Sequence, residues 1–158
     1  MLNSAEKQTK YEEVSKEIIA VTDGENDQIA LMASTAALLH THFAHFIWTG
    51  FYRVSNNERD DLIVGPYQGN LGCLHIPIGK GVCGTAAAKR QTVIVDDVHA
   101  FPGHITCDAR AASEIVVPVF SKNNALIGVL DIDAAETNTF DNVDKEALES
   151  IISGVFQS

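Results

Sequence analysis

The chain has 158 residues, which suits one domain with a single hydrophobic core. Its net charge is −10 and its longest basic run is Lys89-Arg90, which argues against nucleic acid and anionic membranes as partners. The N-terminus lacks the apolar core of a secretory signal, and no apolar run reaches the roughly 18 residues of a membrane span. We therefore expect a cytoplasmic protein without a membrane segment.

Two helices are predicted over the first 44 residues. Residues 5–22 and 26–44 repeat apolar side chains at helical spacing, and Asp23-Gly24 ends the first run. The second run is apolar over a wider face, so we expect that helix to be buried along most of its length. The predicted buried stripe of the first helix consists of Tyr11, Val14, Ile18 and Val21.

Strands are predicted from residue 46 onward, where aromatic and β-branched residues replace the helical pattern. The first two and the last two strands form hairpins, which require antiparallel pairing. The order predicts one α+β domain over residues 1–158, with an antiparallel sheet covered on one face by the N- and C-terminal helices and loops forming a pocket on the other. The predicted elements are strands at 46–54, 61–68, 92–95, 114–120 and 125–133, a loop at 69–81 with a short extended piece around 75–78, a short helix at 82–89, and a final helix at 141–155 capped by Asp141.

Three cysteines, Cys73, Cys83 and Cys107, lie in segments rich in Gly, Pro and His. Cysteines used for packing usually lie in apolar runs, so these positions favour exposed, reactive thiols. Cys83 begins a helix, which lowers a thiol pKa, and Cys107 follows His104, whose imidazolium would favour a thiolate. No Cys-x-x-Cys is present, which excludes a thioredoxin-type site. These residues alone fit thiol chemistry, with a transient redox pair and a third thiol, and equally fit inert loop cysteines.

Three acids converge on one part of the predicted sheet. Asp131 and Asp133 alternate with apolar residues on a strand, so both point to one face, and Glu114 begins the paired strand. Under the loops, desolvation and mutual repulsion would raise the pKa of these carboxyls, and a neutral acid could protonate a substrate oxygen. A solvated sheet face lined by acids fits the same pattern.

Two aromatic residues share one face of the first predicted strand. Trp48 and Tyr52 are four residues apart on one strand, and Gly50 between them leaves room for a ligand. They could form the wall of an apolar slot, although the pattern alone slightly favours packing in the core or on the sheet surface.

Metal and phosphate sites have weaker support. His75, His99 and His104 lie near the cysteines in sequence, but the spacings of standard zinc sites are missing, so we expect no bound metal. Gly79-Lys80-Gly81 resembles part of a phosphate-binding loop, but the full Gly-x-x-x-x-Gly-Lys-Ser/Thr motif is absent.

Several segments together resemble the GAF domains. More narrowly, the chain resembles the free methionine-R-sulfoxide reductase family, whose members are stand-alone GAF domain proteins. The likeness extends over nearly the whole chain, and all three cysteines and the three acids fall in the family's positions. The segments that carry it are residues 48–52 (WTGFY), 65–69 (GPYQG), 78–86 (IGKGVCGTA), 92–98 (TVIVDDV), 101–108 (FPGHITCD), 113–118 (SEIVVP), 128–133 (GVLDID) and 140–144 (FDNVD).

The resemblance implies an oxidoreductase that repairs free methionine (R)-S-oxide. Cys107 matches the attacking thiol, Cys73 matches a resolving thiol, and Cys83 matches a third thiol that could resolve or even attack. The resemblance also implies a homodimer and an intramolecular disulfide that thioredoxin reduces, with NADPH as the final electron source and no bound cofactor. The remaining matches are the acids Glu114, Asp131 and Asp133, which handle the sulfoxide, and Trp48 and Tyr52, which surround the substrate methyl group.

Two other functions use the same residues. A GAF domain could bind a small ligand and regulate a partner, or its cysteines could sense redox state without turnover. Against the first stands the lack of an output domain in these 158 residues.

Overall fold

One antiparallel sheet of six strands organises the chain, and a computed structural model describes all residues, 1–158. The strand order is β3-β2-β1-β6-β5-β4, so the two hairpins lie side by side through β1 and β6. The elements are α1 (Ser4–Thr22), α2 (Gln28–His42), β1 (Phe46–Val54), β2 (Asp61–Gly69), β3 (His75–Pro77), α3 (Gly81–Lys89), β4 (Val93–Val95), a short 3-10 helix (Val98–Ala100), β5 (Ser113–Phe120), β6 (Leu126–Ala134) and α4 (Asn142–Phe156).

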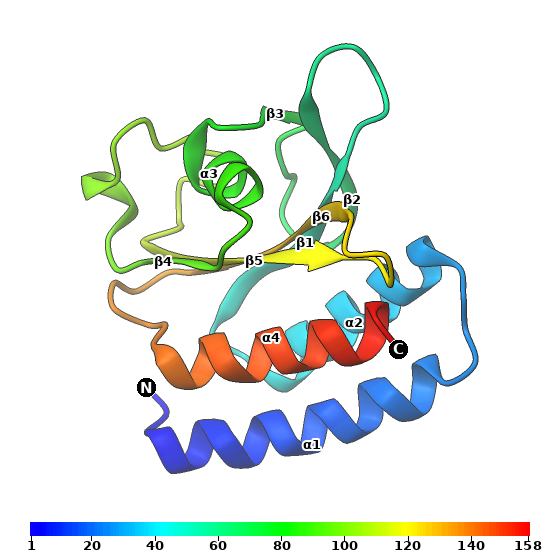
Figure 1. Cartoon of the computed structure of the whole chain (residues 1–158). Coiled ribbons are helices and arrows are strands. Elements are labelled where there is room, and N and C mark those ends of the chain that lie inside the picture. The colour runs from blue at the N-terminus through cyan, green and yellow to red at the C-terminus, as the bar shows by residue number, and fades with distance from the viewer.

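The two faces of the sheet are covered differently. Figure 1 shows α1, α2 and α4 beneath the sheet and α3 with its flanking loops above it. Each face has its own apolar cluster. The larger one lies between the sheet and the three long helices, and the smaller one lies between the sheet and α3. The predicted α+β architecture, with loops gathered on the face away from the long helices, is confirmed. None of the helices is long and apolar enough to cross a bilayer.

Helix ends follow the sequence signals. Asp141 caps α4 and accepts hydrogen bonds from the backbone N–H groups of Val143 and Asp144, as predicted. Asn3 closes a similar capping box at α1, and Gly24 follows that helix with φ at 76°. One side chain of the predicted α1 stripe is misplaced, because Val21 is 57% exposed. It lies in the last turn, where no strand or helix covers α1.

A bulge in β1 sets which aromatic side chains face the site. Phe46 pairs with Ala134 and Trp48 with Asp133, so one extra β1 residue lies between these pairs. Strict alternation would place Phe46 and Trp48 on the same face. Instead, Phe46 packs under the long helices and Trp48 packs on the α3 face. The bulge therefore delivers Trp48 to the side of the sheet that carries the cysteines.

A buried cation joins α1 to α4. Lys7 is 3% exposed, and its Nζ lies 2.5 Å from Asp144 Oδ2 and donates to the Thr139 carbonyl oxygen at 3.0 Å. The Tyr11 hydroxyl donates to the other oxygen of Asp144 at 2.7 Å. A lysine on a helix is normally exposed, so its burial here depends on the carboxylate partner that α4 supplies. The network fixes the N-terminal helix onto the C-terminal one.

Replacing Lys7 by Met should destabilise the fold by about 3–5 kcal/mol, because the carboxylate of Asp144 then stays buried without its cation. Urea unfolding followed by circular dichroism measures the change. Lys16→Met on the exposed face of the same helix is the matched control and should shift the free energy of unfolding by less than about 0.5 kcal/mol. Equal effects of the two substitutions would remove the role assigned to the network.

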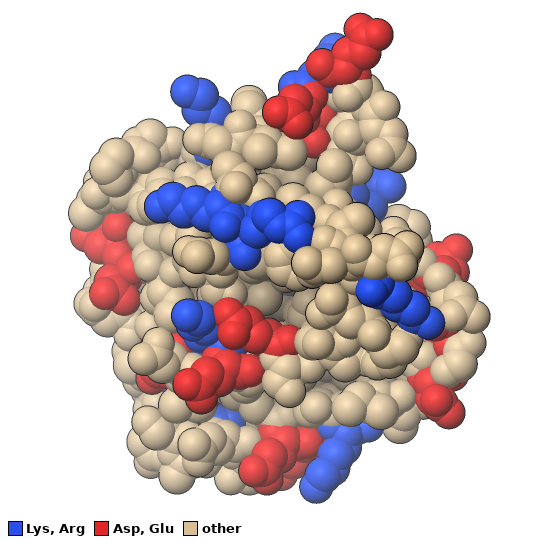
Figure 2. All heavy atoms as spheres, in the orientation of Figure 1, with Lys and Arg blue, Asp and Glu red and all other residues tan.

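The charges on the surface are mixed. On the face that Figure 2 shows, acidic and basic side chains lie among neutral ones, and the basic side chains form only a short band. That face therefore carries no broad field of one sign.

Candidate active site

Strand pairing brings the three acids together. Glu114 lies opposite Asp133 in the β5–β6 ladder, and Asp131 lies opposite Val116. Because side chains alternate along each strand, all three carboxyls point to the α3 face. They are almost fully enclosed, with 5% of Glu114, 5% of Asp131 and 8% of Asp133 exposed. The convergence predicted from the sequence is confirmed, and the solvated alternative is wrong.

Cys83 lies directly over the acids. Its Sγ is 3.9 Å from Glu114 Oε1. The Cys83 Sγ and one carboxyl oxygen each from Glu114 and Asp131 all lie within 4.8 Å of one another. A cavity of about 20 Å³ adjoins this group and has room for about one water molecule. The cavity is lined by Ile76, Gly81, Val82, Cys83, His104, Ile105, Cys107, Asp108, Ala111, Glu114, Asp131 and Asp133.

The glycine-rich motif explains how α3 reaches this position. A Cβ on Gly84 would lie 2.3 Å from the Pro77 carbonyl oxygen, so only glycine lets α3 pack this closely against β3. Gly81 has φ at 61°, and Ile105 of the following loop packs against it. The motif therefore serves close packing around Cys83.

Burial without cations shifts the acids toward their neutral forms. Desolvation, together with the smaller effect of the Asp133 charge, raises the pKa of Glu114 to about 8. Desolvation likewise raises the pKa of Asp131 and of Asp133, with additional repulsion from Glu114 and Asp131 respectively. No Lys or Arg forms an ion pair with any of the three. At neutral pH the cluster therefore holds at least one protonated carboxyl that can donate a proton.

The environment of Cys83 differs from the prediction. The sequence placed it at an exposed helix start with a lowered pKa, but the side chain is 3% exposed. Desolvation and the charges of Asp131 and Glu114 raise the pKa of its thiol well above the ordinary value. The wrong prediction considered only the helix dipole, whose effect is smaller than burial beside carboxylates.

Cys73 and Cys107 form a disulfide, with their Cα atoms 5.2 Å apart, and Cys83 is free. Cys73 belongs to the loop between β2 and β3, and Cys107 belongs to the loop before β5. Cys107 lines the cavity, whereas Cys73 does not. The bridge therefore joins the two loops that flank the acid cluster, and it leaves Cys107 as the member of the pair nearer the acids.

His104 does not support Cys107 as the sequence suggested. Its Nε2 lies 3.6 Å from Glu114 Oε2, and burial lowers its pKa, so the neutral imidazole is favoured. The turn Phe101 to His104, closed by a backbone hydrogen bond of 3.2 Å, directs it toward the acids. The other two histidines of the metal alternative, His75 and His99, do not line the cavity.

Comparison with known proteins identifies the family. The GAF domain family model matches residues 27–156. Free methionine-R-sulfoxide reductase of Escherichia coli (strain K12) is 42% identical over 143 residues, which span 90% of this chain and 84% of that protein. The chain belongs to the free methionine-R-sulfoxide reductase family of GAF domain proteins.

Two further reductases extend the likeness. Free methionine-R-sulfoxide reductase of Saccharomyces cerevisiae (strain ATCC 204508 / S288c) is 42% identical over 135 residues, 83% of this chain and 75% of that protein. The solved structure of the reductase from Neisseria meningitidis, in complex with its substrate, superposes with a TM-score of 0.89 at 44% identity, covering 94% of this chain and 87% of that one. The likeness therefore spans the whole site as well as the sheet.

In this member of the reductase family, the aromatic pair is packed rather than open. Trp48 stacks between Tyr52 and Tyr67, with ring centroids 5.5 and 5.0 Å apart. A Cβ on Gly50 would lie 2.2 Å from Tyr67 Cβ and 2.7 Å from the Trp48 ring, so the room expected for a ligand is filled. Neither ring lines the cavity. The pair therefore lies on the same face of the sheet as the acids, with Trp48 opposite Asp133 in the β1–β6 ladder, but its rings pack against each other outside the cavity.

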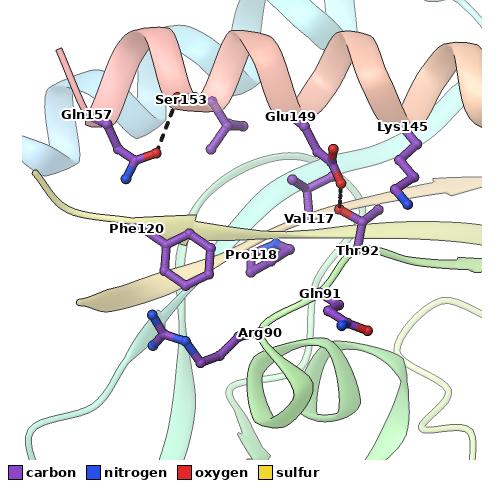
Figure 3. Close-up of a pocket in the computed structure, with 11 residues that line it drawn as sticks. Arg90, Gln91, Thr92, Val117, Pro118, Phe120, Lys145, Glu149, Ser153 and Gln157 are labelled. Atoms are coloured by element: carbon purple, nitrogen blue, oxygen red, sulfur yellow. Dashed lines mark hydrogen bonds between the residues drawn. The ribbon is translucent and has the colours of Figure 1, made fainter. Parts of the chain in front are cut away.

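A larger groove exists elsewhere in this reductase family member. It measures about 520 Å³ and runs between α4 and the outer edge of β5, with Arg90, Lys145 and Glu149 among its side chains (Figure 3). Thr92 donates to Glu149 across it at 2.6 Å. The groove holds no cysteine and no buried acid, so size alone does not locate the chemistry.

Proposed function

We propose that this chain reduces free L-methionine (R)-S-oxide to methionine through Cys107 and the three buried acids. The observation that carries the proposal is the Cys73–Cys107 disulfide, because Cys107 lines a cavity together with Glu114, whose pKa of about 8 keeps its carboxyl mostly protonated at neutral pH. A sulfoxide reductase needs both a thiol that can become oxidised and a proton donor for the departing oxygen. Family membership supports the assignment of the substrate.

The chemistry proceeds in three balanced steps. The Cys107 thiolate attacks the sulfoxide sulfur and forms an S–S bond while Glu114 protonates the oxygen. The hydroxyl then passes from the methionine sulfur to the Cys107 sulfur as that S–S bond and the S–O bond break, so methionine leaves and Cys107 holds a sulfenic acid. The Cys73 thiol then attacks that sulfur, which forms the disulfide and releases water. A reduced thioredoxin-type dithiol exchanges with the disulfide, becomes oxidised itself and restores both thiols, with NADPH as the final electron donor. This cycle suits the reducing cytoplasm and needs no bound cofactor.

Geometry supports Cys73, rather than Cys83, as the resolving thiol. Cys73 already lies within bonding distance of Cys107, whereas Cys83 is buried against Glu114 and Asp131. A thiol whose pKa is raised in this way forms little thiolate and attacks slowly.

Specificity for the free amino acid follows from closure of the site. Asp131 and Asp133 would bind the substrate ammonium, and backbone N–H groups of the 103–108 loop would bind its carboxylate. The oxidised cavity of about 20 Å³ is smaller than a single amino acid, so substrate enters after the disulfide opens and the joined loops separate. A methionine within a peptide lacks both charges and cannot be enclosed.

One turnover should leave a single free thiol per chain. Fully reduced protein mixed with excess free methionine (R)-S-oxide is expected to lose two of its three thiols, with peptide mapping by mass spectrometry finding a 73–107 bridge and an alkylated Cys83. A bridge that includes Cys83 would move the resolving role to that residue.

A coupled assay tests the function as a whole. The protein is mixed with thioredoxin, thioredoxin reductase and NADPH, and free methionine (R)-S-oxide is added. NADPH consumption that requires this epimer, and that is absent with the S epimer or with a blocked peptide, supports the enzyme. If no NADPH is consumed, the result favours a ligand-binding or redox-sensing GAF domain without turnover.

We also propose that the chain forms a homodimer. Ile19 and Val21 at the end of α1 are 53% and 57% exposed, and Ile29 at the start of α2 is 45% exposed. Large apolar residues exposed near the connection between α1 and α2 favour contact with a second copy. Light scattering should give twice the chain mass, and the double change of Ile19 and Val21 to Asp should give the monomer mass. A wild-type monomer at about 100 µM would contradict the proposal.

A further inference from the structure

Cys83 has no step in the proposed cycle, yet it occupies a specific chemical environment. Its Sγ and one oxygen each from Glu114 and Asp131 lie within 4.8 Å of one another, and all three residues are buried. A thiol and two carboxyls that face one another at this separation form a set of possible metal ligands that comes from three different elements, α3, β5 and β6. Their spacing in sequence matches no zinc motif, so only the fold reveals them.

A second observation points to a missing partner at the same place. Asp131 is 5% exposed, and its Oδ1 is buried with no hydrogen-bond partner. An unpaired buried carboxyl oxygen is unfavourable, and such groups commonly pair with a donor or coordinate a cation. No Lys or Arg is paired with the cluster, and the adjoining cavity of about 20 Å³ has room for one ion.

We propose that Cys83, Glu114 and Asp131 bind a thiophilic divalent cation, of which Zn²⁺ is the best fit. Zinc takes thiolate sulfur at about 2.3 Å and carboxylate oxygen at about 2.0–2.2 Å, so tetrahedral ligand atoms lie about 3.5 Å apart. The side chains therefore close by about 1 Å on binding. Mg²⁺ and Ca²⁺ do not fit, because they prefer oxygen ligands only and more of them.

His104 is our candidate for the fourth ligand, and its ring would move toward the cation on binding, because it lies beside Glu114 but outside the group of three. Its Nε2 lies 3.6 Å from the second oxygen of Glu114, and 13% of its side chain is exposed. A fourth ligand at the rim gives the cation a path from solvent as well as tetrahedral coordination. The loop that carries His104 is joined to the β2–β3 loop by the disulfide, so this arrangement belongs to the oxidised form.

The binding itself does not depend on the reductase activity. The effect of the cation on activity does rest on the proposed function. A cation held by Glu114 and Asp131 removes the proton donor and one ligand of the substrate ammonium, so the cation-bound protein is inactive. The test below therefore measures binding alone, and its failure leaves the proposed reduction standing.

Cobalt is the probe, used on the oxidised protein without reductant. Cys83 is then the only free thiol, so any thiolate-to-cobalt charge-transfer band in the near ultraviolet reports on that residue. We expect a saturable band with one Co²⁺ per chain, lost when one equivalent of Zn²⁺ is added, because zinc binds such ligands more tightly. His104→Asn should weaken cobalt binding about 10–100-fold, whereas His42→Asn, at a surface ion pair with Glu17, should leave it unchanged.

Cys83→Ser should remove the band, and Asp131→Asn should weaken it, with near-ultraviolet circular dichroism of each metal-free variant verifying the fold. The proposal is overturned if oxidised wild-type protein gives no band at millimolar Co²⁺, or if Cys83→Ser gives the wild-type band.

Discussion

Replacement of Cys107 by Ser is expected to abolish reduction of free methionine (R)-S-oxide, with a loss of at least about 10⁴-fold. Serine cannot form the sulfenic acid, and its hydroxyl is a far weaker nucleophile than a thiolate. The structure favours Cys107 because it alone of the disulfide pair lines the cavity beside Glu114. Methionine released in a single turnover, measured by mass spectrometry, is the readout because it does not depend on thioredoxin.

The partner cysteines provide the controls. Cys73→Ser should still release one methionine per chain in a single turnover but fail to recycle with thioredoxin, because the sulfenic acid on Cys107 is then not resolved. Cys83→Ser should retain the 73–107 bridge. Full single-turnover activity in Cys107→Ser would move the attacking thiol to Cys83 and would require the acids beside it to be displaced.

The three cysteines show which features of the site the sequence predicts and which depend on the fold. Their loop positions and the family likeness pointed to thiol chemistry, and the bonded pair is one of the alternatives that spacing left open. The sequence could not choose between them, because the pairing depends on how two loops 34 residues apart are folded over the sheet. It also misjudged Cys83, whose pKa depends on carboxyls contributed by two other strands.

The sheet was easier to predict than its details. Apolar alternation and turn residues placed five of the strands within about two residues, since both signals are local, whereas β3 was expected only as an extended piece of a loop. The β1 bulge and the buried Lys7 network were missed for a shared reason: each is decided by partners distant in sequence. The acid cluster was found because alternation within one strand and one hairpin pairing suffice to bring its members together.

Acid and thiol within one cluster impose opposing demands. Carboxylates raise the pKa of a neighbouring thiol, which is the effect seen at Cys83. Cys107, the thiol that we propose to attack the substrate, lies instead on the loop above the cavity, where it can approach the same acids without being enclosed by them. Separation of the thiol at the cavity wall from the thiol beneath the acids lets one site hold a neutral carboxyl and a reactive cysteine.

Glu114→Gln is expected to lower the single-turnover rate by about 10²–10⁴-fold, because the amide cannot protonate the departing oxygen. The pH profile separates this role from a structural one. Burial raises the pKa of Glu114 to about 8, so its acid form persists through neutral pH and is lost as pH rises through that value. The wild-type rate should therefore fall above about pH 8, and this fall should be absent in the variant.

Further substitutions serve as controls for the pH profile of Glu114→Gln. Glu17→Gln on the exposed surface of α1 should keep both the rate and the fall in rate at high pH. Asp131→Asn should impair substrate binding while retaining that fall, because Glu114 still supplies the proton. If Glu114→Gln keeps the fall at high pH, then Asp131 or Asp133 holds the transferred proton. Either has a pKa raised by the same burial, and the same profile measured on Asp133→Asn would identify which of the two it is.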